Sequence, residues 1–191
     1  LLIVRPHWAL PIDTMLLSGL ACVLLAMLWS SNIITSRFHD AAIALFGPLY
    51  IGLTLSTLVS TRTLPSGEWL IVFIALVTWA SDIGAYYAGT LWGRHPLAPS
   101  ISPKKSIEGL AGGLALAVAV ALLTQFWLVP QLPMLHALVL GLLMTGTGLV
   151  GDLCESAMKR AVGVKDSGGI LPGHGGMLDR LDSLLFTAPT F

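Results

Sequence analysis

The stretch GLAGGLALAVAVALLTQFWLV, residues 109–129, decides the fold class. It carries no charged residue, and a transmembrane helix needs about 20 consecutive apolar residues. A strand of a membrane β-barrel would instead alternate apolar and polar residues over about ten positions. The core of this stretch, LALAVAVALL, does not alternate in that way. It therefore predicts a membrane-spanning helix.

Further apolar stretches of this kind run over residues 10–29, 41–60, 69–89 and 134–151. A sixth begins near Leu178 and is cut off by the chain end at Phe191. We predict an all-α fold, a polytopic transmembrane helical bundle with five full spans plus a truncated sixth. Because no long linker separates the stretches, residues 1–191 form a single integral membrane domain. The chain begins without Met, so we expect it to be truncated at the N-terminus, and also at the C-terminus.

The composition supports a membrane protein. Of 191 residues, 10 are Lys or Arg and 10 are Asp or Glu, so 10% are charged and 55% are hydrophobic. Soluble domains carry about 25% charged residues, so this chain lacks the charge to cover a water-exposed surface. The balanced charge excludes a nucleic-acid partner, which requires a basic excess. Two cysteines without metal-binding spacing exclude a disulfide scaffold and a zinc site. The first partner expected is the lipid bilayer.

The basic residues predict the orientation in the membrane. When loops are counted alternately, eight basic residues fall on one side and two on the other. Positive charge is enriched in cytoplasmic loops, so the loops after the first, third and fifth spans are predicted to be cytoplasmic. The eight are Arg37, Arg94, Lys104, Lys105, Lys159, Arg160, Lys165 and Arg180, and the two are Arg5 and Arg62.

Charge is concentrated in GDLCESAMKRAVGVKDSGGILPGHGGMLDRLDS, residues 151–183, which holds nine of the twenty charges. Asp152 and Ser156 share a helical face, as do Asp179 and Ser183, because each pair is four residues apart. Carboxylates are hard oxygen ligands suited to Mg²⁺, and a charged side chain without a partner is costly within a membrane. We therefore predict Asp152 and Asp179 as metal ligands, with Asp182 on the same face as Asp179.

The other residues of this segment suit phosphate. Lys and Arg side chains pair with phosphate oxygens, and the glycine-rich run allows backbone amides to approach an anion closely. Carboxylates, cations and glycines together indicate a phosphoryl or nucleotidyl transfer site. Simpler interpretations stay open for three residues. Lys159 can form an ordinary helix pair with Glu155, Arg160 can extend to the lipid headgroups, and His174 can be satisfied by loop backbone.

A second polar cluster runs from residue 81 to residue 113. Asp82 lies late in the third predicted span with Tyr86 one turn later, and Lys104 and Lys105 follow in the next loop. Ser106 is placed to cap the fourth span, and Glu108 lies in its first turn, where the helix dipole favours a carboxylate. This helix start suits an anion, although the lysines can also serve only to fix topology. Gly109 and Gly113 form a GxxxG pattern that indicates helix packing.

Two segments resemble a known family. The run SAMKRAVGVKDSGGILPGHGGMLDRLD, residues 156–182, resembles the signature of phosphatidate cytidylyltransferases, also called CDP-diacylglycerol synthases. The run SPKKSIEG, residues 102–109, resembles the second motif of that family, with Ser106 where Thr is common. The pattern of Asp82, Tyr86, Gly89 and Gly93 is similar as well. The resemblance covers residues 81–191, the expected catalytic part, whereas residues 1–80 read as generic membrane helices.

The resemblance implies an integral membrane enzyme that condenses CTP with phosphatidate to give CDP-diacylglycerol and pyrophosphate. It implies Mg²⁺, with K⁺ as a second metal, a homodimer, and a bacterial inner (cytoplasmic) membrane with the active site facing the cytoplasm. The catalytic residues expected are Asp152, Ser156, Lys159, Arg160, Lys165, Asp166, His174, Asp179, Arg180 and Asp182, of which Asp152 and Asp179 bind metal. The substrate-binding residues expected are Asp82, Tyr86, Ser102, Lys104, Lys105, Ser106 and Glu108.

Two other functions are alternatives to phosphatidate cytidylyl transfer. A CTP-dependent transferase acting on another lipid phosphate would need the same chemistry, so only the full signature favours phosphatidate. A cation-coupled transporter would place carboxylates near the membrane midplane on broken helices within inverted repeats. In this chain only Asp82 lies well inside a predicted span, and no internal repeat is present. The transferase is therefore the favoured prediction.

Overall fold

The computed structural model describes residues 12–29, 34–164, 167–168 and 176–191, without the side chains of residues 12–15, 34–35 and 180. The chain divides into two compact units, Leu1–Val59 and Ser60–Phe191. All of the site residues predicted from the sequence belong to the second unit. The first unit holds helix α1 (Ile12–Trp29) and most of helix α2 (Ile34–Arg62).

Helix α2 continues through Pro48, although proline removes a backbone donor and disfavours a helix interior. Phe46 and Tyr50, two residues before and two residues after this proline, stack their rings on each other with centroids 5.5 Å apart. Large apolar side chains such as Leu17 and Leu53 are exposed in this unit. Such a surface is expected where helices face hydrocarbon instead of water.

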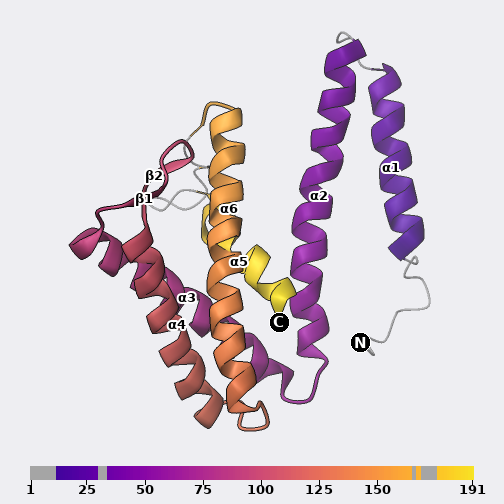
Figure 1. The fold of residues 1–191 in the computed structure, drawn as a ribbon. Helices are drawn as coiled ribbons and strands as arrows, with labels where there is room; N and C mark the ends of the chain where they lie inside the picture. Colours follow the sequence, from indigo (N-terminus) through magenta and orange to yellow (C-terminus); the bar gives the residue numbers. More distant parts are fainter. Residues whose placement is uncertain (1–11, 30–33, 165–166, 169–175) are drawn as a thin grey trace. The chain divides into compact units, whose positions relative to one another are not determined.

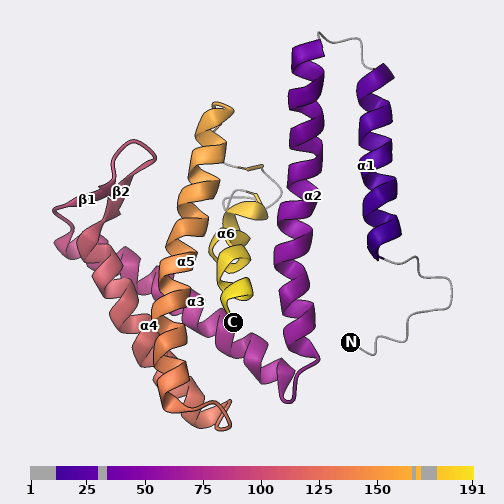
Figure 2. The same ribbon diagram turned by 45° about the vertical axis from the view of Figure 1, so that its right-hand side comes forward.

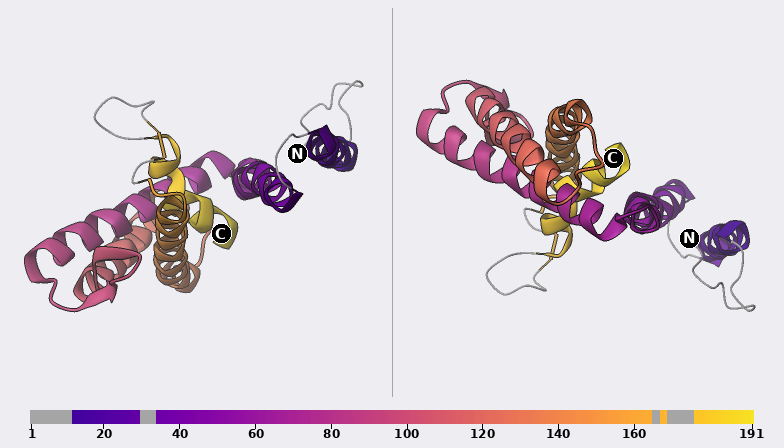
Figure 3. Two further views of the ribbon diagram at one scale, coloured as in Figure 1. Left: turned by 90° about the horizontal axis from the view of Figure 1, so that it is seen from above. Right: turned by 90° about the horizontal axis from the view of Figure 1, so that it is seen from below.

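The second unit is a helical bundle with a small hairpin at one end (Figures 1 and 2). Helix α5 is seen nearly end-on in Figure 3 while α3 is seen along its length, so the two helices cross steeply. The elements in order are α3 (Gly67–Trp92), β1 (Pro96–Ala98), β2 (Ser102–Ser106), α4 (Ile107–Trp127), α5 (Met134–Ala161), α6 (Leu178–Thr187) and the 3₁₀ helix η1 (Ala188–Thr190).

Within the described residues, four helices are long and apolar enough to cross a membrane: Ser36–Arg62 of α2, and α3, α4 and α5. The apolar segment Leu16–Trp29 of α1 is shorter than these four helices. Helix α6 has 10 residues. The predicted polytopic helical membrane protein is therefore confirmed, and four spans are supported within the described residues. The count of five full spans plus a truncated sixth stays a prediction.

Glycines bring α3 and α4 into backbone contact. A Cβ added at Gly84 would lie 2.6 Å from the Gly112 carbonyl oxygen, and one at Gly112 would lie 2.2 Å from Ala88 Cβ. One at Gly113 would lie 2.9 Å from the Ser81 carbonyl oxygen. Small residues of this kind allow membrane helices to approach closely. The packing role predicted for Gly109 and Gly113 is confirmed.

The core lies where α3, α5 and α6 meet. Phe73, Ile74 and Leu185 are fully buried there. Thr78 donates a hydrogen bond through Oγ1 to Thr187 Oγ1 at 3.0 Å, which links α3 to α6. A hydrogen bond between buried hydroxyls gives each a partner, which the surrounding hydrocarbon cannot provide. Helix α6 is thereby held against the two long helices although it is too short to cross the membrane itself.

The segment between α3 and α4 is a hairpin and not an irregular loop. Strands β1 and β2 pair antiparallel, with Pro96 opposite Ser106 and Ala98 opposite Ser102. Ser106 ends β2 and caps α4, since its Oγ accepts a hydrogen bond from the Gly109 backbone N–H at 3.1 Å. The predicted cap is confirmed. The hairpin places Lys104 and Lys105 on a strand whose start and end are both fixed.

We expect Gly112→Ala to destabilise the protein, because its new Cβ would overlap Ala88 Cβ at 2.2 Å and the Gly84 carbonyl oxygen at 2.8 Å. Overpacking of this kind costs about 1–3 kcal/mol. Gly146→Ala is the matched control, since nothing lies within 4 Å of a Cβ at that helical position. Thermal unfolding in detergent, followed by circular dichroism, makes the comparison. Equal unfolding temperatures for the two variants would contradict the proposed packing.

Candidate active site

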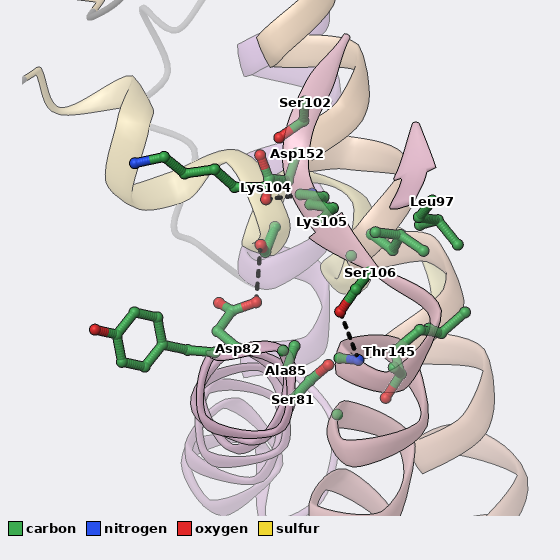
Figure 4. A pocket seen from close by; sticks show the side chains of 18 of the residues that line it. Ser81, Asp82, Ala85, Leu97, Ser102, Lys104, Lys105, Ser106, Thr145 and Asp152 are labelled. Atoms are coloured by element: carbon green, nitrogen blue, oxygen red, sulfur yellow. Dashed lines mark hydrogen bonds and ion pairs between the residues drawn. The ribbon is translucent and has the colours of Figure 1, made fainter. Parts of the chain in front are cut away.

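A cavity of about 510 Å³ lies between the hairpin and the ends of four helices. Figure 4 shows its side chains converging from α3, β2, α5 and α6. Its charged members are four aspartates and two lysines. The residues that line it are Ser81, Asp82, Ala85, Tyr86, Gly89, Thr90, Leu97, Ser102, Lys104, Lys105, Ser106, Gly109, Leu110, Gly113, Thr145, Gly148, Leu149, Asp152, Asp179, Asp182 and Ser183.

Lys105 and Asp152 form an ion pair that bridges β2 and α5. Both side chains are partly buried, with 20% and 34% of their surfaces exposed. Successive residues of a strand point to opposite faces, so Lys104 extends away from Asp152 (Figure 4) and is exposed. Ser156, one turn after Asp152, donates a long hydrogen bond of 3.4 Å to Asp152 Oδ1. The shared helical face predicted for Asp152 and Ser156 is therefore confirmed.

Asp82 and Asp182 both line the cavity and lie close enough to interact electrostatically. Ser183 Oγ donates a hydrogen bond to Asp82 Oδ1 at 3.3 Å, which connects α6 to α3 (Figure 4). The Ser183 backbone N–H donates to Asp182 Oδ1 at 2.7 Å. Burial raises the pKa of the Asp182 carboxyl, although the bond from Ser183 opposes this shift, and the nearby Asp152 charge raises it further. Like charges thus gather on this side of the cavity.

Asp179, at the start of α6, is held by donors from three places. It accepts hydrogen bonds from Lys159 Nζ at 2.7 Å, the Gly176 backbone N–H at 2.7 Å and the Ser167 hydroxyl at 2.8 Å. The Ser167 backbone N–H also donates to Oδ2 at 3.0 Å. Burial alone would raise the pKa of this carboxyl, but the hydrogen bonds outweigh it and hold that pKa well below its usual range.

Lys159 connects Asp179 to a second carboxylate. Its Nζ lies 3.3 Å from Glu155 Oε1, and the Glu155 side chain is only 1% exposed. The ammonium group of Lys159 is the compensating charge of Glu155, and the Asp182 carboxyl of α6 also lies beside Glu155. The helix pair of Lys159 with Glu155 that the sequence suggested is present. Lys159 also pairs with Asp179, which lies twenty residues further along the chain.

Glu108 stabilises the connection between α3 and the hairpin. Its Oε2 accepts hydrogen bonds from the backbone N–H groups of Arg94 and His95 at 3.1 and 3.2 Å, and its Oε1 lies 2.5 Å from His95 Nδ1. These bonds tie the end of α3 to the start of α4. Glu108 does not line the cavity, so its geometry positions the lysine-bearing strand and gives no sign of substrate contact.

The sequence-predicted residues divide into three groups. Those that line the cavity are Asp82, Tyr86, Ser102, Lys104, Lys105, Ser106, Asp152, Asp179 and Asp182. Those described but not lining it are Glu108, Ser156, Lys159 and Arg160, the last donating from Nη1 to the Val164 carbonyl oxygen at 3.3 Å. Lys165, Asp166, His174 and the Arg180 side chain lie outside the described residues.

Three residues of the network were not predicted as site residues. Glu155 was explained by its helical spacing to Lys159, and Ser183 was noted only as the face partner of Asp179. Ser167 stands between a charged pair and glycines, and its hydroxyl and backbone N–H both donate to the Asp179 carboxylate. Ser167 and Ser183 bind partners 12 and 101 positions away along the chain, and no local sequence pattern predicts such a contact.

The carboxylates suit a hard divalent cation by their chemistry. Asp82, Asp152 and Asp182 offer oxygen donors to one cavity, which is the donor type that Mg²⁺ prefers. Asp152 is engaged by Lys105, and Asp179 by Lys159. Among the residues with described side chains, no three His, Cys, Asp or Glu residues are grouped closely enough to hold an ion. Carboxylate oxygens are the donor type that suits Mg²⁺, and the pairs of Asp152 with Lys105 and of Asp179 with Lys159 engage oxygens that a metal would need.

The fold and cavity define an integral membrane protein whose helix ends enclose a charged site. The sequence model of the cytidylyltransferase family matches residues 2–191, and the chain belongs to that family. It is similar to the phosphatidate cytidylyltransferase of Bacillus subtilis (strain 168), with 43% identity over 158 residues, which is 81% of this chain and 58% of that protein.

Relatives with the same name occur in other bacteria. The phosphatidate cytidylyltransferases of Staphylococcus saprophyticus and Staphylococcus epidermidis (strain ATCC 35984) are each 43% identical over 152 residues, which is 80% of this chain and 58% of each relative. This chain thus spans somewhat over half the length of these relatives. The family resemblance seen in residues 81–191 is confirmed.

We expect Lys159→Met to destabilise the protein by about 3–5 kcal/mol, because it leaves the buried Glu155 carboxylate without a compensating charge. Arg62→Met is the matched control, since Arg62 Nη1 pairs with Glu68 at 3.0 Å but with side chains 61% and 54% exposed. Exposed pairs contribute about 0–1 kcal/mol. Chemical denaturation in mixed micelles measures both variants. Similar losses for both would show that Glu155 does not depend on Lys159.

Proposed function

We propose that the protein is a nucleotidyltransferase that condenses CTP with phosphatidate, releasing pyrophosphate and CDP-diacylglycerol. The observation that carries the proposal is the cavity, where two lysines from β2 meet four aspartates from three helices. Such a mixture of cations and hard oxygen ligands suits two phosphate-bearing substrates and a divalent metal. Membership of the cytidylyltransferase family and the names of the bacterial relatives support the same reaction.

In the reaction, a phosphate oxygen of phosphatidate attacks the α-phosphorus of CTP, and the bond from that phosphorus to the pyrophosphate oxygen breaks. A phosphate dianion is already nucleophilic near neutral pH, so no side chain has to remove a proton. Lys104 and Lys105 reduce the repulsion between the two anions and orient them. Lys159, Arg160, Lys165 and Arg180 are proposed to clamp the triphosphate and the leaving pyrophosphate.

Asp152 and Asp179 are proposed to hold Mg²⁺, with K⁺ as a second metal. The Mg²⁺ ion would neutralise phosphate charge and hold the reacting groups in line. The proposed roles of Ser156, Asp166, His174 and Asp182 are to support this arrangement from the same segment. Asp82, Tyr86, Ser102, Ser106 and Glu108 are proposed to shape the substrate side, with Glu108 acting through its hydrogen bonds to Arg94 and His95.

We further propose that the protein lies in the bacterial inner membrane as a homodimer, with the cavity facing the cytoplasm. CTP is a cytosolic nucleotide, while the acyl chains of the lipid stay in hydrocarbon, so the reaction belongs at that interface. The eight-to-two distribution of basic residues supports the orientation. The family resemblance supports the dimer.

The complete protein, purified in detergent with Mg²⁺, is expected to convert labelled CTP and phosphatidate into a CDP-lipid. Asp152→Asn is expected to lower the rate on the order of 100-fold or more, as loss of one electrostatic contact to a reacting phosphate does. Removal of Mg²⁺ by a chelator is expected to stop the reaction, and added Mg²⁺ to restore it. Glu68→Gln, in the exposed pair with Arg62, is the control that keeps full activity.

A panel of lipid phosphates in the same assay separates the parts of this proposal. Nucleotide transfer only to a polyprenyl phosphate or an ether-lipid phosphate would overturn the acceptor and leave the chemistry standing. Full activity of Asp152→Asn and Asp179→Asn would overturn the metal ligands. No CDP-lipid from any acceptor would overturn the function.

Cysteine labelling tests the orientation. In a variant whose Cys22 and Cys154 are changed to Ser, Ser100→Cys lies in the exposed turn of the hairpin and Gln131→Cys in the exposed turn between α4 and α5. A membrane-impermeant maleimide added to intact spheroplasts is expected to label Gln131→Cys and to spare Ser100→Cys. Inverted vesicles are expected to show the opposite pattern. Labelling of Ser100→Cys in spheroplasts would place the cavity on the outer side.

A further inference from the structure

Lys105 occupies the place in the cavity where negative charge converges. Its ammonium group pairs directly with Asp152 on α5. It also interacts electrostatically with Asp82 on α3 and Asp182 on α6, and these two aspartates interact with Asp152 and with each other. Three carboxylates from three helices thus share one lysine, which does not come from any of those helices.

This arrangement needs a cation for physical reasons. Carboxylates that share a poorly solvated cavity repel one another and require a compensating charge. Of the two lysines that line the cavity, only Lys105 has an ion-pair partner among the described residues. Lys104 extends from the other face of the strand and is exposed (Figure 4). The two adjacent lysines therefore occupy different environments and do not duplicate each other.

We propose that Lys105 is an internal counter-ion, which a divalent cation displaces from Asp152 and which then turns to the phosphate of the substrate. The inference rests on the proposed function and adds to it an order of events at the same site. The cation and the ammonium group compete for one carboxylate, so both cannot hold it fully. Displacement takes from Lys105 its direct ion-pair partner, Asp152, and a phosphate oxygen supplies another.

The local structure permits this movement. Lys105 lies on strand β2, whose partner strand is short. The pairing of β1 with β2 is irregular between Pro96 and Ala98. The lysine side chain has four rotatable carbons between backbone and charge.

The inference has a thermodynamic consequence. If metal binding frees Lys105 for phosphate, then metal and anionic substrate strengthen each other's binding, and the coupling is reciprocal. A lysine that served only to fix topology would show no such coupling. A lysine that only bound phosphate would not compete with metal when substrate is absent. Metal binding to the substrate-free protein therefore separates the three roles.

The first test measures Mn²⁺ binding by electron paramagnetic resonance, with no nucleotide or lipid phosphate present. Lys105→Met is expected to bind Mn²⁺ about tenfold more tightly than the unmodified protein, which corresponds to about 1.4 kcal/mol. Lys104→Met is the matched control and is expected to change the affinity by less than about twofold, because Lys104 extends away from Asp152. Unchanged or weaker Mn²⁺ binding by Lys105→Met would overturn the proposal.

The second test uses the unmodified protein, so it holds even where Lys105→Met does not fold. Acetylation of lysine by a water-soluble active ester is followed by mass spectrometry with and without Mg²⁺. Mg²⁺ is expected to raise labelling of Lys105 relative to Lys104 several-fold, because the ammonium group loses its partly buried carboxylate partner. An unchanged or lower ratio contradicts displacement.

These outcomes are separate from those of the activity assay. Neither test contains substrate, so a failure to form CDP-lipid would overturn the proposed function while leaving both measurements interpretable. A protein that forms CDP-lipid but shows no change in Lys105 labelling would keep its function and lose this inference.

Discussion

The structure of the second unit depends on the close approach of α3 and α4. Gly84 and Gly112 leave no room for side chains between the two backbones, and this contact holds the last turns of α3 beside the first turns of α4. The hairpin spans that distance, with Ser106 as the cap of α4 and Glu108 bonded back to Arg94 and His95. Because the hairpin carries Lys104 and Lys105, a steric constraint inside the bundle sets the position of positive charge in the cavity.

Charge in the cavity is organised by connections between elements. Lys105 of β2 pairs with Asp152 of α5, Lys159 of α5 with Asp179 of α6, and Ser183 of α6 with Asp82 of α3. Each contact neutralises a carboxylate or satisfies it by hydrogen bonding, and each joins two elements. The groups that would bind substrate therefore also hold the helix ends together. A change of charge at one of them alters the electrostatic environment of the others.

The local features were predictable because they depend on short-range rules. Hydrophobicity located the long helices, the cap at Ser106 followed from residue type and position, and Gly109 and Gly113 indicated packing. Helix α5 runs ten residues beyond the predicted span end at Gly151 to Ala161, because charge ends an apolar stretch but does not end a helix. The hairpin has no alternating apolar pattern, and the Lys105–Asp152 pair joins residues 47 positions apart. Such contacts depend on packing that no local window contains.

Asp179 holds both ends of one segment. It binds Ser167 on one side and Gly176 on the other, and a Cβ at Gly176 would lie 2.2 Å from Ser167 Oγ. Ser167 and Gly176, nine positions apart in the sequence, are therefore held together at one carboxylate. A single substitution at Asp179 would therefore remove the contacts of Ser167 and Gly176 with α6 at the same time.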